Sequence, residues 1–218
     1  MENNNTPYNY ILFDDRKNDN PQFLIFLHGF GADNTDLGYM YDVLKTKVSN
    51  VVYIGLNGIK KTDFGMGYQW FDLDFNLLND MDYLKSGLEK SYIYVERFLE
   101  YVVKKYNTSY DKINLLGFSQ GGMLSVFLGL KIKNKLKNII CHSGMLIDSI
   151  NSEDIINKDN FFTIIHGNMD EVIYVDKFNK TIELMEKFGI SGNSFLIKDL
   201  GHSFSRESIE IVEKILNN

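Results

Sequence analysis

The most informative stretch of this sequence is Lys112-Ile-Asn-Leu-Leu-Gly-Phe-Ser-Gln-Gly-Gly-Met-Leu124. Its first half contains Ile113 to Leu116, a short and mostly apolar run that predicts a buried strand. Its second half leads into Gly122 to Leu130, which is apolar on nearly every face and long enough to be a buried helix. A strand, a sharp turn and a helix form the setting in which the pattern Gly-x-Ser-x-Gly, here residues 117–121, marks a nucleophilic serine.

The residue types in this turn fit that interpretation. Ser119 would occupy a strained turn that lifts its hydroxyl clear of the sheet, and Gly117 and Gly121 would let the strand and the helix pass closely. The start of the helix would direct backbone N–H groups and a partial positive charge at a developing oxyanion. The pattern also arises by chance, so a tight strand–helix turn with an unreactive serine is the alternative interpretation.

The size and composition of the chain bound the class of protein. A length of 218 residues fits a single α/β domain over residues 1–218, in which residues 1–9 form a flexible tail. The net charge of −6 provides no basic field for phosphates, which argues against a nucleic-acid partner. No apolar run approaches the ~20 residues of a membrane span, so we expect no stable membrane insertion.

The cysteine content and the N-terminus indicate the compartment. Cys141 is the single cysteine, so no internal disulfide can form. The polar N-terminus lacks both the basic and the apolar region of a signal peptide. We therefore expect a cytoplasmic protein.

Strands alternate with helices along the chain, which predicts a doubly wound, mostly parallel sheet with right-handed crossovers. The predicted strands are 10–13, 22–27, 51–54, 113–116, 136–141, 161–165 and 195–198. The predicted helices are 36–48, with Asp36 as the N-cap, and 83–106, 122–130, 174–188 and 205–216. Residues 55–82 are the longest irregular stretch, and their aromatic content favours an ordered, functional loop.

A serine nucleophile needs a base, and the base needs an orienting acid. In hydrolases with this turn the chain order is serine, acid, histidine. Asp170 follows the predicted strand 161–165, and His202 follows the predicted strand 195–198. Because sites in α/β sheets form beyond the carboxyl ends of the strands, we expect Ser119 to bond His202 and His202 to bond Asp170. The alternative interpretations are a surface histidine and a helix-capping aspartate.

The remaining histidines are interpreted differently. His28 and His166 each end a strand before a glycine, and we expect them to shape loops. His142 adjoins Cys141, but one cysteine and scattered histidines lack the spacing of metal ligands. We therefore expect no metal and no cofactor, and we interpret Cys141 as a small buried hydrophobe.

Two backbone N–H groups should form the oxyanion hole. One belongs to Gln120, directly after the nucleophile, and the other to the loop after the strand 22–27, where Phe30 is the best candidate. The alternative for this glycine-containing loop is a phosphate site, but it lacks both G-x-G-x-x-G and the Walker lysine. Residues 64–71, with Met66 and Phe71, form either an apolar wall for the substrate or a plug of the core.

With these residues assembled, the chain resembles the phospholipase/carboxylesterase family of small α/β-hydrolases, which contains acyl-protein thioesterases and bacterial carboxylesterases. The matching stretches are Phe26-Leu-His-Gly-Phe-Gly31, Gln69-Trp-Phe-Asp72, Leu115-Leu-Gly-Phe-Ser-Gln-Gly-Gly122, His166-Gly-Asn-Met-Asp-Glu-Val172 and Gly201-His202. The resemblance implies an α/β-hydrolase fold without a separate lid domain and a triad of Ser119, Asp170 and His202. It also implies oxyanion donors at Phe30 and Gln120, and a substrate pocket beside Trp70.

The sequence therefore predicts a serine hydrolase of carboxylic esters or thioesters that works through an acyl-enzyme. An open site would suit an acyl group carried on a lipid or on an acylated protein. The rival interpretations are a dienelactone-hydrolase-like enzyme, which would use a cysteine nucleophile, and a binding module that has lost catalysis. The sequence leaves the oligomeric state open, and a homodimer is compatible with it.

Overall fold

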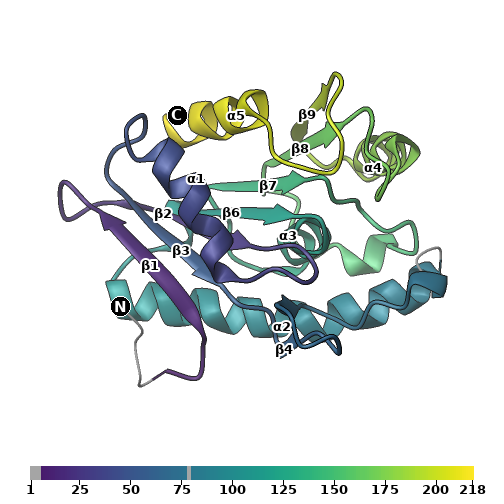
Figure 1. Cartoon of the computed structure of the whole chain (residues 1–218), viewed down its shortest axis with the longest axis horizontal. Coiled ribbons are helices and arrows are strands. Elements are labelled where there is room, and N and C mark those ends of the chain that lie inside the picture. The colour runs from purple at the N-terminus through teal and green to yellow at the C-terminus, as the bar shows by residue number, and fades with distance from the viewer. Residues whose placement is uncertain (1–5, 78–79) are drawn as a thin grey trace.

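The computed structural model describes residues 6–77 and 80–218. Within these ranges, seven strands form a central sheet in the order β1-β3-β2-β6-β7-β8-β9 (Figure 1). β1 is antiparallel to β3, and the other neighbours are parallel. The strands are β1 (Tyr10–Asp15), β2 (Gln22–Leu27), β3 (Val51–Leu56), β6 (Ile113–Phe118), β7 (Asn138–His142), β8 (Phe162–Gly167) and β9 (Gly192–Ile197).

Helices cover both faces of the sheet, which confirms the doubly wound prediction (Figure 1). One face carries α2 (Met81–Tyr106), α3 (Gln120–Lys131) and α4 (Val175–Phe188), and the other carries α1 (Leu37–Leu44) and α5 (Arg206–Leu216). The short elements are η1 (Asn34–Asp36), β4 (Lys60–Lys61), β5 (Tyr68–Gln69), η2 (Phe75–Leu77), η3 (Tyr110–Lys112) and η4 (Ser152–Asp154).

The period of two along the strands sends successive side chains to the two faces. In β2, Phe23, Ile25 and Leu27 join the core beneath α2 and α3, whereas Leu24 and Phe26 join the core beneath α1 and α5. Because both faces are covered, β2 reads as a continuous apolar run rather than an alternating one. Because β2, β6, β7, β8 and β9 are parallel neighbours, the carboxyl ends of β2, β6, β8 and β9 lie at one edge of the sheet.

The first helix differs from the prediction at both ends. Asp36 makes no capping side-chain bond; instead, the Asp33 side chain accepts from the N–H of Thr35 over 2.8 Å and caps η1. The helix ends at Leu44 instead of continuing to residue 48. The aspartate three residues earlier is the better cap because its backbone is extended, whereas Asp36 already has helical dihedral angles.

The chain start and the last strand also differ from the prediction. Residues 1–5 of the predicted tail lie outside the described residues, but Tyr8 packs against Tyr94, Phe98 and Tyr101 of α2. This part of the predicted tail is therefore attached to the fold. β9 begins at Gly192, three residues before the predicted start, because its exposed edge position needs no apolar run there. In the described part of the chain, no helix has the length and apolar character to cross a membrane.

Candidate active site

The turn between β6 and α3 places Ser119 in a strained backbone conformation, with φ 54° and ψ −117°. The flanking glycines make this turn possible. A Cβ on Gly117 would lie 2.0 Å from the carbonyl oxygen of Gly121, and a Cβ on Gly121 would lie 2.2 Å from the carbonyl oxygen of Leu27. Because no larger residue fits either position, strand, helix and serine can approach only with glycine at both.

Ser119 lies within hydrogen-bond distance of a histidine that is itself bonded to a carboxylate. The Oγ of Ser119 is 2.9 Å from Nε2 of His202, and Nδ1 of His202 is 2.7 Å from Oδ2 of Asp170. His202 and Asp170 come from the loops after β9 and β8. The structure therefore brings together the three residues singled out in the sequence, in the arrangement that a nucleophile, a base and an orienting acid require.

Asp170 is buried, and both of its carboxylate oxygens accept hydrogen bonds. Its Oδ1 accepts from the backbone N–H groups of Val172 and Ile173, each over 2.9 Å, while Oδ2 accepts from His202. Burial would raise the pKa of this carboxyl, but the hydrogen bonds from His202, Ile173 and Val172 outweigh burial, so the pKa of Asp170 lies below its ordinary value. The carboxylate thus stays charged and keeps the N–H of the imidazole facing it.

The histidines interpreted as loop-shaping residues make such contacts. Nδ1 of His28 donates to the carbonyl of Gly29 over 2.7 Å, and Nε2 accepts from the N–H of Gly58 over 3.0 Å. Nε2 of His166 donates to the carbonyl of Ile173 over 2.7 Å. Burial lowers the pKa of both imidazoles, so both remain neutral braces of the loops that carry site residues.

His142 and Cys141 lie at the end of β7 and are fully buried. Burial lowers the pKa of His142 to about 3 and raises the pKa of Cys141 to about 12. A thiol with such a pKa carries no thiolate at neutral pH and cannot act as a nucleophile. Among the residues that the structure describes, no group of three or more His, Cys, Asp or Glu side chains could hold a metal ion.

The two candidate oxyanion donors come from two separate segments, the start of α3 and the loop after β2. Gln120 is the first residue of α3, where backbone N–H groups have no acceptor inside the helix. Phe30 lies in the loop after β2, and both residues line the same cavity as Ser119. Their placement agrees with the expectation, and their role in binding an oxyanion stays a prediction.

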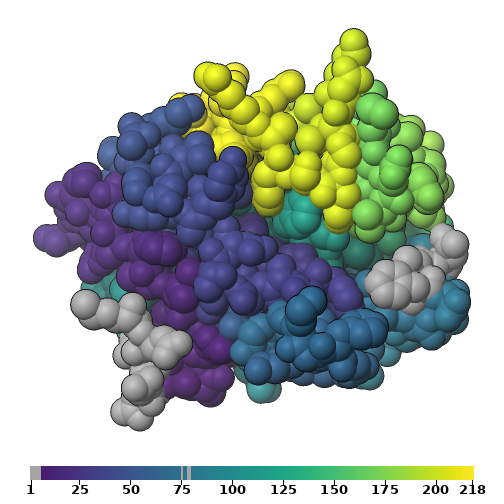
Figure 2. Space-filling view, in the orientation of Figure 1, coloured from purple at the N-terminus to yellow at the C-terminus, as the bar shows by residue number. Residues whose placement is uncertain are grey.

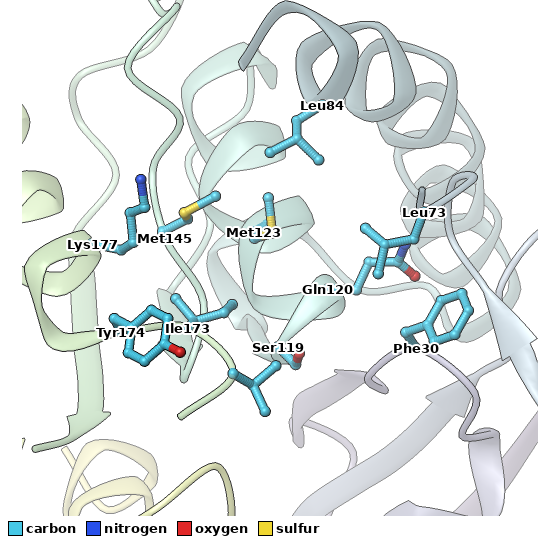
Figure 3. A pocket seen from close by; sticks show the side chains of 11 residues that line it. Phe30, Leu73, Leu84, Ser119, Gln120, Met123, Met145, Ile173, Tyr174 and Lys177 are labelled. Carbon is cyan, nitrogen blue, oxygen red and sulfur yellow. The ribbon is translucent and has the colours of Figure 1, made fainter. Parts of the chain in front are cut away.

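An apolar cavity of about 210 Å³ begins at Ser119. Figure 3 shows Met123 and Met145 between Ser119 and Leu84, so the cavity extends from the serine hydroxyl along α3 toward α2. In the space-filling view, teal atoms lie at the bottom of a hollow between the indigo, green and yellow segments (Figure 2). The lining residues are Phe30, Leu73, Leu84, Ser119, Gln120, Met123, Met145, Val172, Ile173, Tyr174 and Lys177.

The substrate-binding prediction for Trp70, Phe71 and Met66 is not supported, because none of the three lines this cavity. Trp70 and Phe71 are 1% and 5% exposed and belong to the core beneath α2 and α3. Met66 is 75% exposed. Of the two interpretations of residues 64–71, the plug of the core describes Trp70 and Phe71.

Sequence reasoning missed most of the cavity wall. Met123 and Leu84 belong to helical stretches whose apolar pattern does not distinguish a cavity wall from the core. The positions of Ile173 and Tyr174 could have been predicted, because they follow Asp170 within a few residues and must therefore lie near the site.

Comparison with known proteins identifies the family. The family described as Phospholipase/Carboxylesterase matches residues 13–218 of this chain. The chain belongs to the phospholipase/carboxylesterase family. This membership confirms both the resemblance and the predicted enzyme class, a hydrolase of carboxylic esters.

Other members of the family match over most of their length. Acyl-protein thioesterase 1 homolog 2 of Dictyostelium discoideum is 30% identical over 213 residues, which cover 88% of this chain and 90% of that protein. Acyl-protein thioesterase 1 of Aspergillus fumigatus is 28% identical over 212 residues, which cover 88% and 86%.

Solved structures share the fold. The crystal structure of esterase PE8 has a TM-score of 0.88 at 22% identity, covering 97% of this chain and 99% of that one. A carboxylesterase from Mesorhizobium loti has a TM-score of 0.79 at 18% identity, covering 100% and 98%. These likenesses confirm the α/β-hydrolase fold.

Proposed function

We propose that this protein is a serine hydrolase that cleaves carboxylic esters or thioesters of apolar acyl groups through Ser119, His202 and Asp170. The observation that carries the proposal is the pair of contacts that joins the three residues, 2.9 Å from Ser119 Oγ to His202 Nε2 and 2.7 Å from His202 Nδ1 to Asp170 Oδ2. The strained turn at Ser119 supports it further, because strain of this kind concentrates at functional sites.

In the first half of the reaction, Oγ of Ser119 attacks the acyl carbonyl carbon while Nε2 of His202 takes the hydroxyl proton. The negative charge that forms on the carbonyl oxygen is stabilised by the backbone N–H groups of Phe30 and Gln120 and by the start of α3. Asp170 stabilises the imidazolium, which then gives its proton to the departing alcohol or thiol. The acyl group remains on Ser119 as an ester.

In the second half, His202 removes a proton from a water molecule that attacks the acyl-enzyme, and the same oxyanion donors stabilise the second intermediate. The collapse of this intermediate releases the carboxylic acid and restores Ser119. The low pKa of Asp170 keeps its charge available in both halves, because the carboxylate must not itself take the proton.

The acyl group would occupy the cavity that extends from Ser119 past Met123 and Met145 to Leu84. Each CH₂ group buried there should contribute about 0.8 kcal/mol, which is roughly a fourfold gain in kcat/KM. We therefore expect kcat/KM to rise along a series of nitrophenyl esters until the chain fills the cavity, and to level off or fall beyond that length. The same series as thioesters would distinguish an esterase from a thioesterase preference.

The proposal is tested by Ser119→Ala, which should lower kcat for a short nitrophenyl ester by about 10⁶-fold. The matched control is Ser125→Ala on α3, the helix that follows Ser119. The hydroxyl of Ser125 is buried and donates to the carbonyl of Gly122 over 2.8 Å, so its loss should leave turnover unchanged. Retained turnover in Ser119→Ala would refute the triad, and a wild-type protein without turnover would favour the binding module.

The natural acyl carrier is the finer part of this proposal. Relatives are named acyl-protein thioesterases, and we extend to this chain the hydrolysis of acyl groups from a lipid or from an acylated protein. A cytoplasmic location and a homodimer stay predictions.

A further inference from the structure

Residues 68–71 lie against the loop that carries one of the proposed oxyanion donors. The backbone N–H of Gly31 donates to the carbonyl of Tyr68 over 2.9 Å, and the N–H of Tyr68 donates to the carbonyl of Ala32 over 2.7 Å. These two bonds hold the two residues that directly follow Phe30, so any movement of residues 68–71 would move that loop.

Trp70 donates hydrogen bonds to both segments that carry the proposed oxyanion donors, the loop after β2 and the start of α3. Its indole Nε1–H donates to the carbonyl of His28 over 2.8 Å, and its backbone N–H donates to Oε1 of Gln120 over 2.9 Å. The same amide group returns a bond, since Nε2 of Gln120 donates to the carbonyl of Phe71 over 2.8 Å. All four residues are buried, so water does not compete for these bonds.

Trp70 is itself fixed by the surrounding fold. The hydroxyl of Ser91 on α2 donates to the carbonyl of Trp70 over 2.7 Å. The ring of Trp70 lies 5.2 Å from the ring of His28, whose nitrogens are held by Gly29 and Gly58. The loop after β2 and the start of α3 are thus tied through one tryptophan to the long helix α2.

We propose that Trp70 is a positioning residue for the oxyanion hole, because it sets the distance between the loop of Phe30 and the first turn of α3. This role rests on the proposed function, since it requires a developing oxyanion between the two N–H groups. Such donors stabilise a transition state only when they are held in place before the reaction, and a displacement of about 1 Å can cost up to ~10²-fold in rate.

The position of Trp70 predicts which kinetic constant it controls. The residue is 1% exposed and does not line the cavity at Ser119, so it makes no contact with a bound acyl group. Loss of the indole N–H should therefore lower kcat and leave KM nearly unchanged. A wall of the substrate pocket would instead change KM.

Two variants remove the indole donor. The first is Trp70→Phe, which keeps an aromatic ring and the backbone N–H that Gln120 accepts. The second exploits the single tryptophan of the chain. Biosynthetic replacement of tryptophan by benzothienylalanine exchanges the N–H for sulfur with little change in shape. It therefore tests the hydrogen bond even where Trp70→Phe does not fold.

The measurements compare turnover with the binding of two inhibitors. The first inhibitor is a trifluoromethyl ketone, whose carbonyl carbon is attacked by Oγ of Ser119. The serine proton passes to His202, and the ketone oxygen becomes an oxyanion in the oxyanion hole. An unreactive ether of the same chain length fills the cavity without an oxyanion. In either variant we expect kcat and ketone affinity to fall together by about tenfold to a hundredfold, with ether affinity unchanged.

The control is Asn114→Leu at the opposite end of β6. It removes the hydrogen bonds that the buried Asn114 makes with Gln22, Phe23 and Asn138, so it should lower thermal stability and leave kcat unchanged. An unchanged kcat in the benzothienylalanine protein, or equal losses of ether and ketone affinity, would overturn the role of Trp70. Wild-type turnover, measured first, tests the proposed function separately.

Discussion

Two buried aspartates of this fold, Asp170 and Asp154, have similar surroundings but different hydrogen-bond partners. Asp170 lies on a loop and Asp154 ends the short helix η4, yet both accept hydrogen bonds on each carboxylate oxygen, and both have a pKa below the ordinary value for aspartate. Burial is the largest influence on each and would raise the pKa, but in each case the hydrogen bonds outweigh it. Their partners differ: Asp170 faces an imidazole that can exchange a proton, whereas Asp154 faces two lysines.

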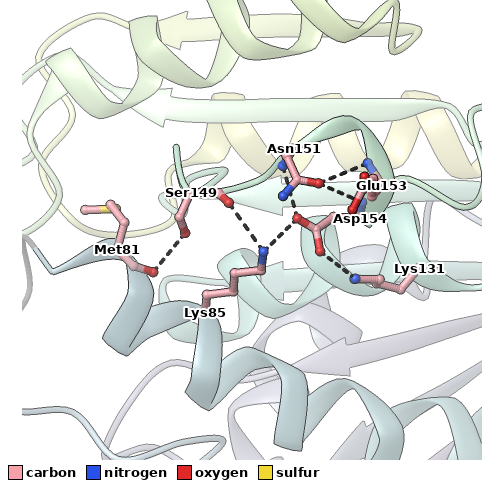
Figure 4. Close-up of polar contacts among 7 residues, drawn as sticks. All are labelled: Met81, Lys85, Lys131, Ser149, Asn151, Glu153 and Asp154. Carbon is pink, nitrogen blue, oxygen red and sulfur yellow. Dashed lines mark hydrogen bonds and ion pairs between the residues drawn. The ribbon is translucent and has the colours of Figure 1, made fainter.

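Asp154 fastens the segment 148–160 to two helices (Figure 4). Its Oδ2 lies 2.7 Å from Nζ of Lys85 on α2, and its Oδ1 lies 2.9 Å from Nζ of Lys131 at the end of α3. Oδ2 also accepts from the backbone N–H of Asn151 over 3.0 Å. Because its contacts lead to two lysines and a backbone N–H and not to Ser119, this carboxylate holds structure.

Burial and a low pKa therefore do not by themselves mark a catalytic carboxylate. What separates Asp170 is the chain of contacts through His202 to the hydroxyl of Ser119. The two aspartates therefore predict opposite phenotypes, in which one substitution removes activity and the other removes stability.

The largest effect is expected for Asp170→Asn. The amide still accepts from Val172 and Ile173, but it no longer stabilises the imidazolium or keeps the N–H of His202 on Nδ1. We expect kcat to fall by about 10⁴-fold, with a small change in the free energy of unfolding. Ester turnover and urea unfolding of the same preparation measure both quantities, and a variant within tenfold of wild type would contradict the assignment.

The reverse result is expected for Asp154→Asn. The pKa of Asp154 is about 2 against an ordinary value of 3.8, a difference that corresponds to about 2 kcal/mol of folding free energy at neutral pH. The substitution should lower the unfolding free energy by about that amount and leave kcat unchanged. A loss of turnover in a folded Asp154→Asn protein would show that the segment 148–160 serves the site as well as the fold.

The contribution of Asp154 to stability should depend on pH. Because the folded-state pKa of Asp154 is depressed, its contribution is fully present above the ordinary pKa of 3.8 and is lost as the pH falls through about 2. The difference in unfolding free energy between wild type and Asp154→Asn should therefore stay constant from pH 7 to about pH 5 and shrink toward zero near pH 2. Thermal unfolding across this range checks it, and a difference independent of pH would assign the loss to packing alone.

The smallest effect is expected at Cys141. Its thiol is buried and has a pKa of about 12, so iodoacetamide should leave the activity of the folded protein unchanged over the time in which it alkylates free cysteine. The same reagent should modify Cys141 once the chain is unfolded in urea. Inactivation of the folded enzyme would revive the cysteine-nucleophile alternative.

The fold and the candidate triad could be predicted because they depend on local signals with strong physical causes. The apolar run of β2 and the glycines around Ser119 each specify a conformation that few other sequences allow. Asp170 and His202 follow from topology, since parallel strands bring their carboxyl ends to one edge.

The cavity could not be predicted because its wall is assembled from separate helices and loops. Leu84 and Met123 have the periodicity of core residues, and nothing in the sequence shows that space remains between them. The substrate-binding prediction for Trp70 failed for a related reason. An aromatic residue beside a site can either contact the substrate or support the surrounding structure, and the sequence does not distinguish the two. Its hydrogen bonds to His28 and Gln120 become visible only in three dimensions.

The decisive measurement is the identity of the residue that reacts with a fluorophosphonate, a reagent that phosphonylates an activated serine. Mass spectrometry of the digested protein should find one modification, on Ser119, and it should disappear in Asp170→Asn at short reaction times while persisting in Asp154→Asn. A label on another residue, or equal labelling of both variants, would contradict the claim that Ser119, His202 and Asp170 act as a unit.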